Sequence, residues 1–149
     1  MQESLRIGWG EADITPDNSK VELSGQYYQR LATGIHSRIK TVALALEKGS
    51  QQALMICLDV VNFPEEFQKE VRAIVHQEIP ALRPESIFLN AIHTHSAPYT
   101  QATGLFRDWL PLDQDALKPA DYLVFLKTQI LSAAKTAWES RAAGGIAPA

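Results

Sequence analysis

Cysteine is almost absent from this 149-residue chain, which has only Cys57. A single cysteine can form no disulfide within the chain, so the fold must rest on a hydrophobic core rather than on cross-links. Cys57 lies in the apolar run 53–58. An apolar setting raises the pKa of a thiol and leaves it unreactive, so we expect Cys57 to be a small buried hydrophobic residue.

Long apolar runs and an excess of positive charge are also lacking. No stretch is apolar enough for a transmembrane segment, and the first residues carry no apolar signal sequence. We therefore expect a cytoplasmic protein, or a secreted one if a leader has been removed. The net charge of -3 offers no broad basic surface, which argues against nucleic acid as a partner.

The chain does have ample material for a core, with 46% hydrophobic residues. Alternating and β-branched residues predict a strand over 5–14 and a short strand over 21–25. Two further apolar runs, 41–46 and 52–61, are separated by the turn residues 48–50. This pattern is typical of a β-hairpin.

Helices are predicted on either side of one more strand. Asn62 is a candidate N-cap and Pro64 suits the first helical position, and the helix is expected to end near Pro80. A strand over 87–92 follows, and a second helix begins at Pro119. The prediction is an α/β fold: a mixed sheet with at least two helices, with residues 1–149 forming a single domain.

The segment 99–118 is a long connection with glycine, proline, tryptophan and several aspartates. Long connections without regular structure are often functional, so it is a candidate lid or substrate loop. An irregular surface segment without function explains the same composition equally well.

The strongest chemical signal is the sequence His93-Thr94-His95 at the end of the predicted strand 87–92. Alternate side chains of an extended chain point to the same side, so the two histidines are expected together, with Thr94 on the other side. Paired imidazoles can bind a metal ion or a polarised substrate oxygen. A pair of hydrogen-bonded histidines without chemistry is the competing interpretation.

Three segments in this order carry a family resemblance: IGWGEADIT at 7–15, GIHSR at 34–38 and IHTHSAP at 92–98. Together they resemble the N-terminal part of the catalytic domain of the neutral (non-lysosomal) ceramidase family. Two positions depart from the family signature T-H-T-H-S-G-P, with Ile92 in place of threonine and Ala97 in place of glycine. The resemblance implies that the chain is an incomplete portion of a larger ceramidase-like domain.

The resemblance also implies an activity, zinc-dependent hydrolysis of the amide bond of N-acylsphingosine or a related lipid amide. It implies that His93 is a zinc ligand, and that the remaining ligands to the one ion lie outside this chain. His95 is implied as a catalytic residue beside the bound water and the substrate carbonyl. Gly25 matches a glycine beside the family's active site, although it is equally well a turn glycine; His36 is a candidate for the same substrate pocket or a polar packing residue.

Other functions compete with this one. A non-catalytic ceramidase-like module, binding a lipid or a partner chain, needs no complete set of zinc ligands. Metallo-β-lactamase-like H-x-H-x-D-H proteins are disfavoured, because Ala97 and Pro98 stand where the aspartate and final histidine belong. An incomplete α/β sheet leaves an open edge and an apolar face, so we also expect self-association.

Overall fold

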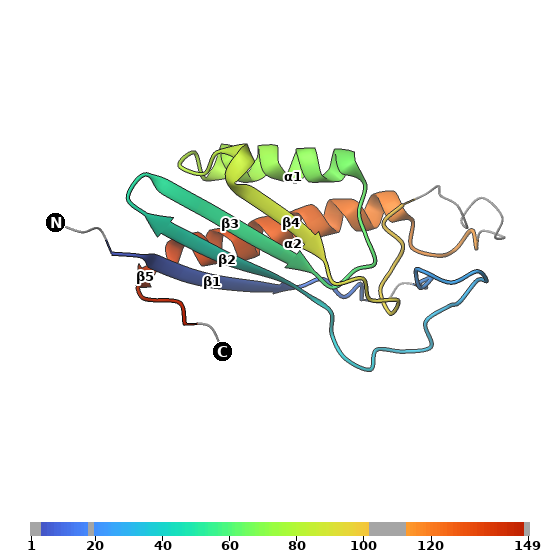
Figure 1. The fold of residues 1–149 in the computed structure, drawn as a ribbon. Helices are drawn as coiled ribbons and strands as arrows, with labels where there is room; N and C mark the ends of the chain where they lie inside the picture. Colours follow the sequence, from blue (N-terminus) through green and yellow to red (C-terminus); the bar gives the residue numbers. More distant parts are fainter. Residues whose placement is uncertain (1–3, 18–19, 102–112, 148–149) are drawn as a thin grey trace.

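The computed structural model describes residues 4–17, 20–101 and 113–147, and it forms one mixed five-stranded sheet with two helices on one face (Figure 1). The elements are β1 (Arg6–Asp13), β2 (Lys40–Lys48), β3 (Gln51–Leu58), α1 (Glu65–Glu78), the 3-10 turn η1 (Pro84–Ser86), β4 (Ile87–Ala91), α2 (Pro119–Glu139) and β5 (Ala142–Ala143). The strand order is β4-β3-β2-β1-β5. The predicted α/β class, with a mixed sheet and two helices, is confirmed.

The hairpin is as predicted, and a helical crossover follows it. Strands β2 and β3 pair antiparallel across a turn at Gly49, whose φ of 59° suits glycine. Strand β4 pairs parallel with β3, and α1 connects the two. A parallel pair needs such a crossover, and here it brings the C-terminal ends of β3 and β4 side by side.

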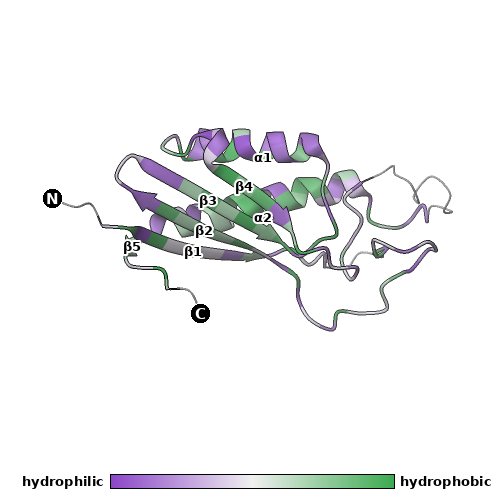
Figure 2. Cartoon of the chain, in the orientation of Figure 1, coloured by the Kyte–Doolittle hydropathy of each residue, from purple (hydrophilic) through white to green (hydrophobic). Residues whose placement is uncertain are grey.

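Helix α2 lies directly against β1 because β1 carries glycine where the helix crosses it. A Cβ at Gly8 would overlap the carbonyl of Ala137, and one at Gly10 would overlap the carbonyl of Ala133. Both facing residues are alanines, so the helix and strand backbones approach unusually closely. Figure 2 shows that α2 is mostly hydrophobic, whereas α1 is largely hydrophilic and buries one stripe only.

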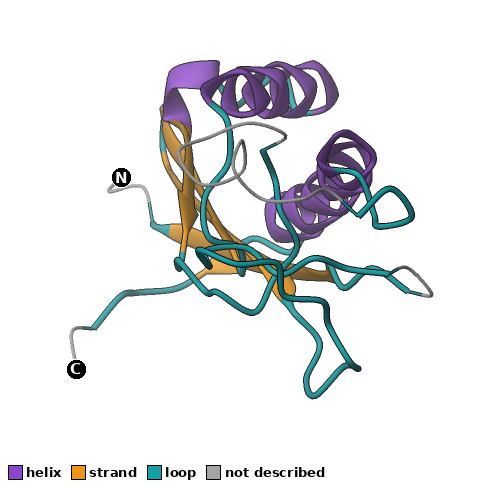
Figure 3. Ribbon diagram, turned by 90° about the vertical axis from the view of Figure 1, so that its right-hand side faces the viewer, coloured by secondary structure: helices purple, strands orange, loops and turns teal. Residues whose placement is uncertain are grey.

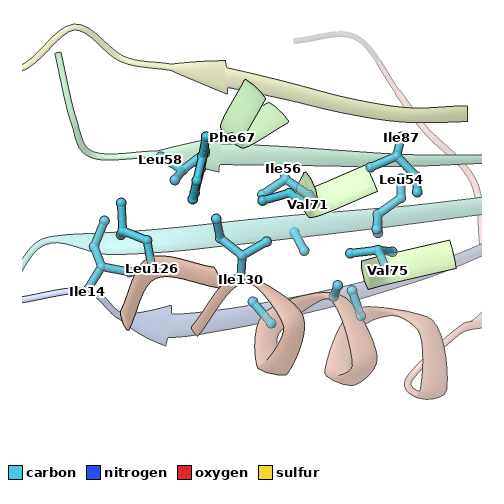
Figure 4. Close-up of a cluster of buried hydrophobic side chains, with 14 of the residues drawn as sticks. Ile14, Leu54, Ile56, Leu58, Phe67, Val71, Val75, Ile87, Leu126 and Ile130 are labelled. Carbon is cyan, nitrogen blue, oxygen red and sulfur yellow. The ribbon is translucent and has the colours of Figure 1, made fainter. Parts of the chain in front are cut away.

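The core lies between the sheet and the two helices, and Figure 4 shows its side chains meeting from both layers. Strand β3 contributes Leu54, Ile56 and Leu58, all fully buried. Buried phenylalanine and valine side chains of α1 and leucine and isoleucine side chains of α2 pack on them. At about 25 cal/mol per Å² of apolar surface, this burial is the main driving force for folding.

Three local predictions need correction or fall outside the described residues. Helix α1 begins at Glu65 with Pro64 as its N-cap. The Thr100 hydroxyl lies 3.3 Å from Asn62 Oδ1 and 2.7 Å from the Asn62 backbone carbonyl, so the Asn62 side chain faces Thr100 instead of capping the helix. Segment 21–25 makes isolated bridges rather than a strand, because its partners lie on separate loops. The lid prediction for 99–118 falls largely on 102–112, which lie outside the described residues.

Cys57 is half-buried rather than buried, because it lies on the sheet face that the helices leave uncovered. Its Sγ accepts a hydrogen bond from Asn90 Nδ2 at 3.0 Å. Within the described residues, neither helix is both long and apolar enough to cross a membrane.

Candidate functional site

The two histidines of the motif lie in the turn that follows β4. The turn begins where the His93 N–H donates to the Val60 carbonyl, 3.0 Å away. His93 has a φ of 66°, in the left-handed region that costs a non-glycine residue roughly 1–2 kcal/mol. The prediction that 93–95 continue as an extended strand is therefore wrong, because β4 ends at Ala91 and the chain turns at His93.

The turn nevertheless brings both imidazoles together. The ring centroids of His93 and His95 are 5.2 Å apart, and the rings meet edge to face at 63°. His93 is exposed and His95 is half-buried. The prediction that the two side chains lie side by side is confirmed, but the cause is a left-handed turn and not the alternation of side chains along a strand.

The His93 ring is held in one tautomer by the backbone. Its Nδ1 lies 3.0 Å from the carbonyl oxygen of Val61, just beyond β3. A carbonyl can only accept, so Nδ1 carries the proton and Nε2 keeps its lone pair free. Metal-binding histidines commonly donate their second ring nitrogen to a carbonyl in this way.

The His95 ring is positioned by the segment 24–30. The Ser24 N–H donates to the Ala97 carbonyl at 2.9 Å, which brings Gly25 against the histidine turn. Gly25 has a φ of 88°, and a Cβ there would overlap the His95 ring. Arg30 Nη2 also donates to the His95 carbonyl. Gly25 therefore contacts His95 and leaves the ring no alternative position on that side.

A cavity of about 640 Å³ adjoins the same turn. Thr94 and Ser96 line it, while His93 and His95 do not. His36, an exposed residue, also lines it, and its Nδ1 lies 3.5 Å from Ser37 Oγ. The structure therefore groups Gly25, His93 and His95, and it places His36 in the wall of the adjoining cavity.

Residues that the sequence did not mark also shape the site. Val61 acts through its carbonyl, which leaves no trace in a sequence pattern, and Arg30 lies in a polar loop without periodicity. Asp59 also follows β3, and its Oδ2 accepts a hydrogen bond from the Lys40 N–H at 2.8 Å. Asp59 therefore closes the β2–β3 ladder rather than supporting the histidines.

The hydrogen bonding of His93 is that of a metal-binding histidine, so the described residues offer one candidate metal ligand, His93. Among the described residues, no group of three or more histidine, cysteine, aspartate or glutamate side chains could hold a metal ion. A catalytic zinc needs about three protein ligands. The part of the chain that the structure describes is therefore not a complete zinc site.

Solved structures share this arrangement of elements. A neutral ceramidase from Pseudomonas aeruginosa matches with a TM-score of 0.76 over 97% of this chain and 23% of that chain, at 20% identity. This chain has the fold of a portion of neutral ceramidase. A ceramidase complexed with C2 matches with the same TM-score over 95% of this chain and 22% of that one, at 22% identity. No protein-family model matches the sequence, and neither does any curated protein.

The chain spans less than a quarter of the length of each of these ceramidase structures. At this level of identity the likeness concerns the fold. It agrees with the resemblance of the three sequence segments to a portion of a ceramidase-like domain.

Proposed function

We propose that this chain supplies one wall of the active site of a zinc-dependent amide hydrolase of the ceramidase type. The proposed substrate is N-acylsphingosine or a related lipid amide. The fold likeness supports the hydrolase class. The observation that carries the zinc assignment is the hydrogen bond of His93 Nδ1 to Val61, which leaves Nε2 free to coordinate.

Within this proposal His93 is the zinc ligand that the chain contributes, and the other ligands come from outside it. A bound zinc ion lowers the pKa of a coordinated water and polarises the substrate carbonyl. The left-handed turn at His93 serves this role because it presents Nε2 away from β3. Backbone strain of this kind is often retained at functional sites.

His95 is the proposed catalytic residue. Its ring contacts the His93 ring, with the two ring centroids 5.2 Å apart. A ring nitrogen of His95 can therefore hydrogen-bond a water or a carbonyl oxygen held at His93. Gly25 supports this role by contacting the ring, and Arg30 holds the backbone of the same residue. Hydrogen bonds preorganised in this way stabilise the charge that develops on the substrate oxygen.

His36 and Gly25 are the proposed substrate contacts. His36 lines the cavity of about 640 Å³, whose walls combine hydroxyl groups with aliphatic side chains. Such a mixed lining suits a polar head group joined to an apolar chain. Gly25 contacts the His95 ring, so its backbone can meet a substrate that is held beside that ring.

A non-catalytic module that binds a lipid or a partner chain is the second candidate. It is favoured by one observation, that the described residues hold no group of three metal-binding side chains. The two functions differ in whether the gene product that carries this sequence binds zinc.

The test compares His93→Asn with His76→Asn in that gene product. Asparagine tolerates a left-handed φ, so His93→Asn removes the imidazole without adding backbone strain. His76 is the matched control, because its Nδ1 also bonds a carbonyl, that of Leu82 at 2.7 Å, on α1. Zinc per chain is measured by elemental analysis, and hydrolysis with a fluorogenic N-acyl amide.

We expect His93→Asn to lower bound zinc at least tenfold and hydrolysis by about a thousandfold, which is about 4 kcal/mol of transition-state stabilisation. His76→Asn should change neither. A wild-type protein that binds no zinc and cleaves no amide would favour the non-catalytic module. Full zinc occupancy in His93→Asn would remove His93 from the metal site.

A further inference from the structure

The cavity of about 640 Å³ beside the histidine turn has a basic wall. It is built from the loop between β1 and β2 and from the turn after β4, which meet at one end of the sheet (Figures 1 and 3). Its basic members are Arg30 and His36, and none of the described residues that line it is acidic. The hydroxyl groups of the wall belong to Thr15, Thr33, Ser37, Thr94 and Ser96. The wall therefore offers a positive charge and several hydrogen-bond donors to a ligand.

The charge of Arg30 is not neutralised by any described residue. Its Nη2 donates to the backbone carbonyl of His95, and no aspartate or glutamate of the described ranges forms an ion pair with it. Its Nε is buried and, within the part of the chain that the structure describes, has no hydrogen-bond partner. A guanidinium stays protonated and has five N–H donors, so most of its capacity is unused. Because a buried donor without an acceptor is costly, a purely structural role does not explain this side chain.

The acidic residues nearest to this loop in the sequence are engaged elsewhere. Asp13 and Asp17 both pair with Arg38, whose side chain does not line the cavity. Glu22 is only 4% exposed, and its Oε1 accepts the Asp113 N–H at 3.2 Å. The loop thus contains one arginine that is paired with carboxylates and one that faces a cavity without them.

The rest of the cavity wall is largely aliphatic. Its aliphatic side chains include Val21, Leu23, Leu31, Ile35 and Ile39. A cavity of several hundred Å³ with such a wall suits an organic ligand better than a small inorganic anion. A ligand that joins an acidic group to an alkyl part would use both kinds of wall.

We propose that this cavity binds an acidic head group, and that Arg30 selects a lipid amide with a carboxylate on its amine half over a neutral one. This inference rests on the amide hydrolysis proposed above, and it narrows the related lipid amide to the class of N-acyl amino acids. The planar fork of a guanidinium matches a carboxylate in both shape and charge. The head group of N-acylsphingosine is neutral and would leave the charge of Arg30 unused.

Arg30 also connects the cavity to the proposed catalytic residue. It lines the cavity and holds the carbonyl of His95, while Thr94 and Ser96, the two neighbours of His95, line the same cavity. A head group bound at Arg30 therefore lies beside the turn that carries both imidazoles. Hydrolysis adds one water across the amide C–N bond, with the hydroxyl group on the acyl carbon and the proton on the nitrogen. The products are a fatty acid and a free amino acid.

Binding to the zinc-free gene product tests the charge preference separately from catalysis. N-octanoylglycine and N-octanoylethanolamine differ only in a carboxylate against a hydroxymethyl group. We expect calorimetry to find the glycine compound bound at least about tenfold more tightly, because only its carboxylate forms charge-assisted hydrogen bonds. Octanoate has a carboxylate without the amide, and it should bind more weakly than N-octanoylglycine.

Substitutions of Arg30 separate the charge from the support of the loop. Arg30→Gln should weaken N-octanoylglycine about 30-fold and N-octanoylethanolamine less than about threefold. Arg30→Lys should keep a preference for the carboxylate, because the positive charge remains. Arg38→Gln is the matched control, since Arg38 lies in the same loop and is neutralised by Asp13, and it should change neither affinity.

A second substitution tests the cavity without removing Arg30. Thr33 is exposed and lines the cavity, so Thr33→Glu adds a negative charge to the wall without disturbing the core. It should weaken N-octanoylglycine about tenfold by like-charge repulsion and leave N-octanoylethanolamine unchanged. Circular dichroism melts establish that all variants fold.

Equal affinities of wild type for the two amides, or equal losses of both in Arg30→Gln, would overturn the proposal. So would octanoate binding as tightly as N-octanoylglycine, or a gene product that binds neither amide because other polypeptide fills the cavity. Failure of the proposed hydrolase gives a different result. A gene product that prefers the carboxylate but cleaves neither amide keeps this binding site and loses the hydrolysis. One that cleaves both amides with the same kcat/KM keeps the hydrolysis and loses the selection by Arg30.

Discussion

The layer of sheet and helix and the turn at the histidines are held by different kinds of contact. In the layer, the backbones of β1 and α2 touch directly at Gly8 and Gly10, and many buried side chains contribute to the stability of the packing. At the turn, single hydrogen bonds place single residues, such as Val61 for His93 and Arg30 for His95. The layer therefore tolerates little added volume, whereas the turn depends on individual polar partners.

The largest effect is expected at the contact between β1 and α2. Gly10→Ala adds a methyl group that overlaps the Ala133 carbonyl, and neither backbone can move without disturbing the core. We expect a loss of at least about 3 kcal/mol in the free energy of unfolding. Chemical denaturation measures it, with Gly34→Ala as the control because a Cβ at Gly34 meets nothing within 4 Å. Equal stability of both variants would contradict the close approach.

A smaller effect with a sharper functional readout is expected at Gly25. Gly25→Ala must accommodate both a φ of 88° and the overlap with the His95 ring. We expect a loss of about 2 kcal/mol in unfolding free energy and a displaced His95 ring. Histidine NMR resonances report the ring directly, and His76 should keep its shifts. Unchanged His95 resonances would show that Gly25 does not position the ring.

The smallest effect is expected at Tyr122, which belongs to the layer. Its hydroxyl donates to the Ile14 carbonyl at 2.9 Å, so Tyr122→Phe should cost about 1 kcal/mol. Burial raises the pKa of the Tyr122 phenol well above its usual value. The folded protein thus keeps the phenol neutral while the unfolded chain ionises above about pH 10.

The sign of the pH effect follows from this shift. A raised pKa in the folded state gives stability that is fully present below about pH 10 and is lost as the pH rises further. The advantage of wild type over Tyr122→Phe should therefore be constant near neutral pH and shrink above about pH 10. Denaturation at about pH 7 and about pH 11 checks it, and an advantage that grows at the higher pH would contradict the buried phenol.

The layer was largely predictable because periodicity reports burial. The β2–β3 hairpin, the crossover through α1 and the start of α2 at Pro119 all follow from apolar spacing and turn residues. Helix α1 begins later than a cap at Asn62 would place it, because the Asn62 side-chain oxygen accepts a hydrogen bond from Thr100 instead. Contacts between distant loops of this kind leave no local pattern.

The histidine turn was predictable in composition and not in conformation. The motif indicated that His93 and His95 belong together, but nothing in the sequence marks His93 as left-handed. The carbonyl of Val61 and the loop placement of Gly25 are tertiary features. The half-buried position of Cys57 was missed because apolar runs look alike whether one face or both faces of a strand are covered.

The most direct test of the zinc assignment is NMR of the histidine ring nitrogens during titration of this chain with zinc. We expect His93 to carry its proton on Nδ1 and its Nε2 resonance to shift at lower zinc concentration than that of His76, because the His93 ring is exposed whereas His76 is half-buried on α1. Equal responses of His93 and His76, or a proton on Nε2 of His93, would contradict the account.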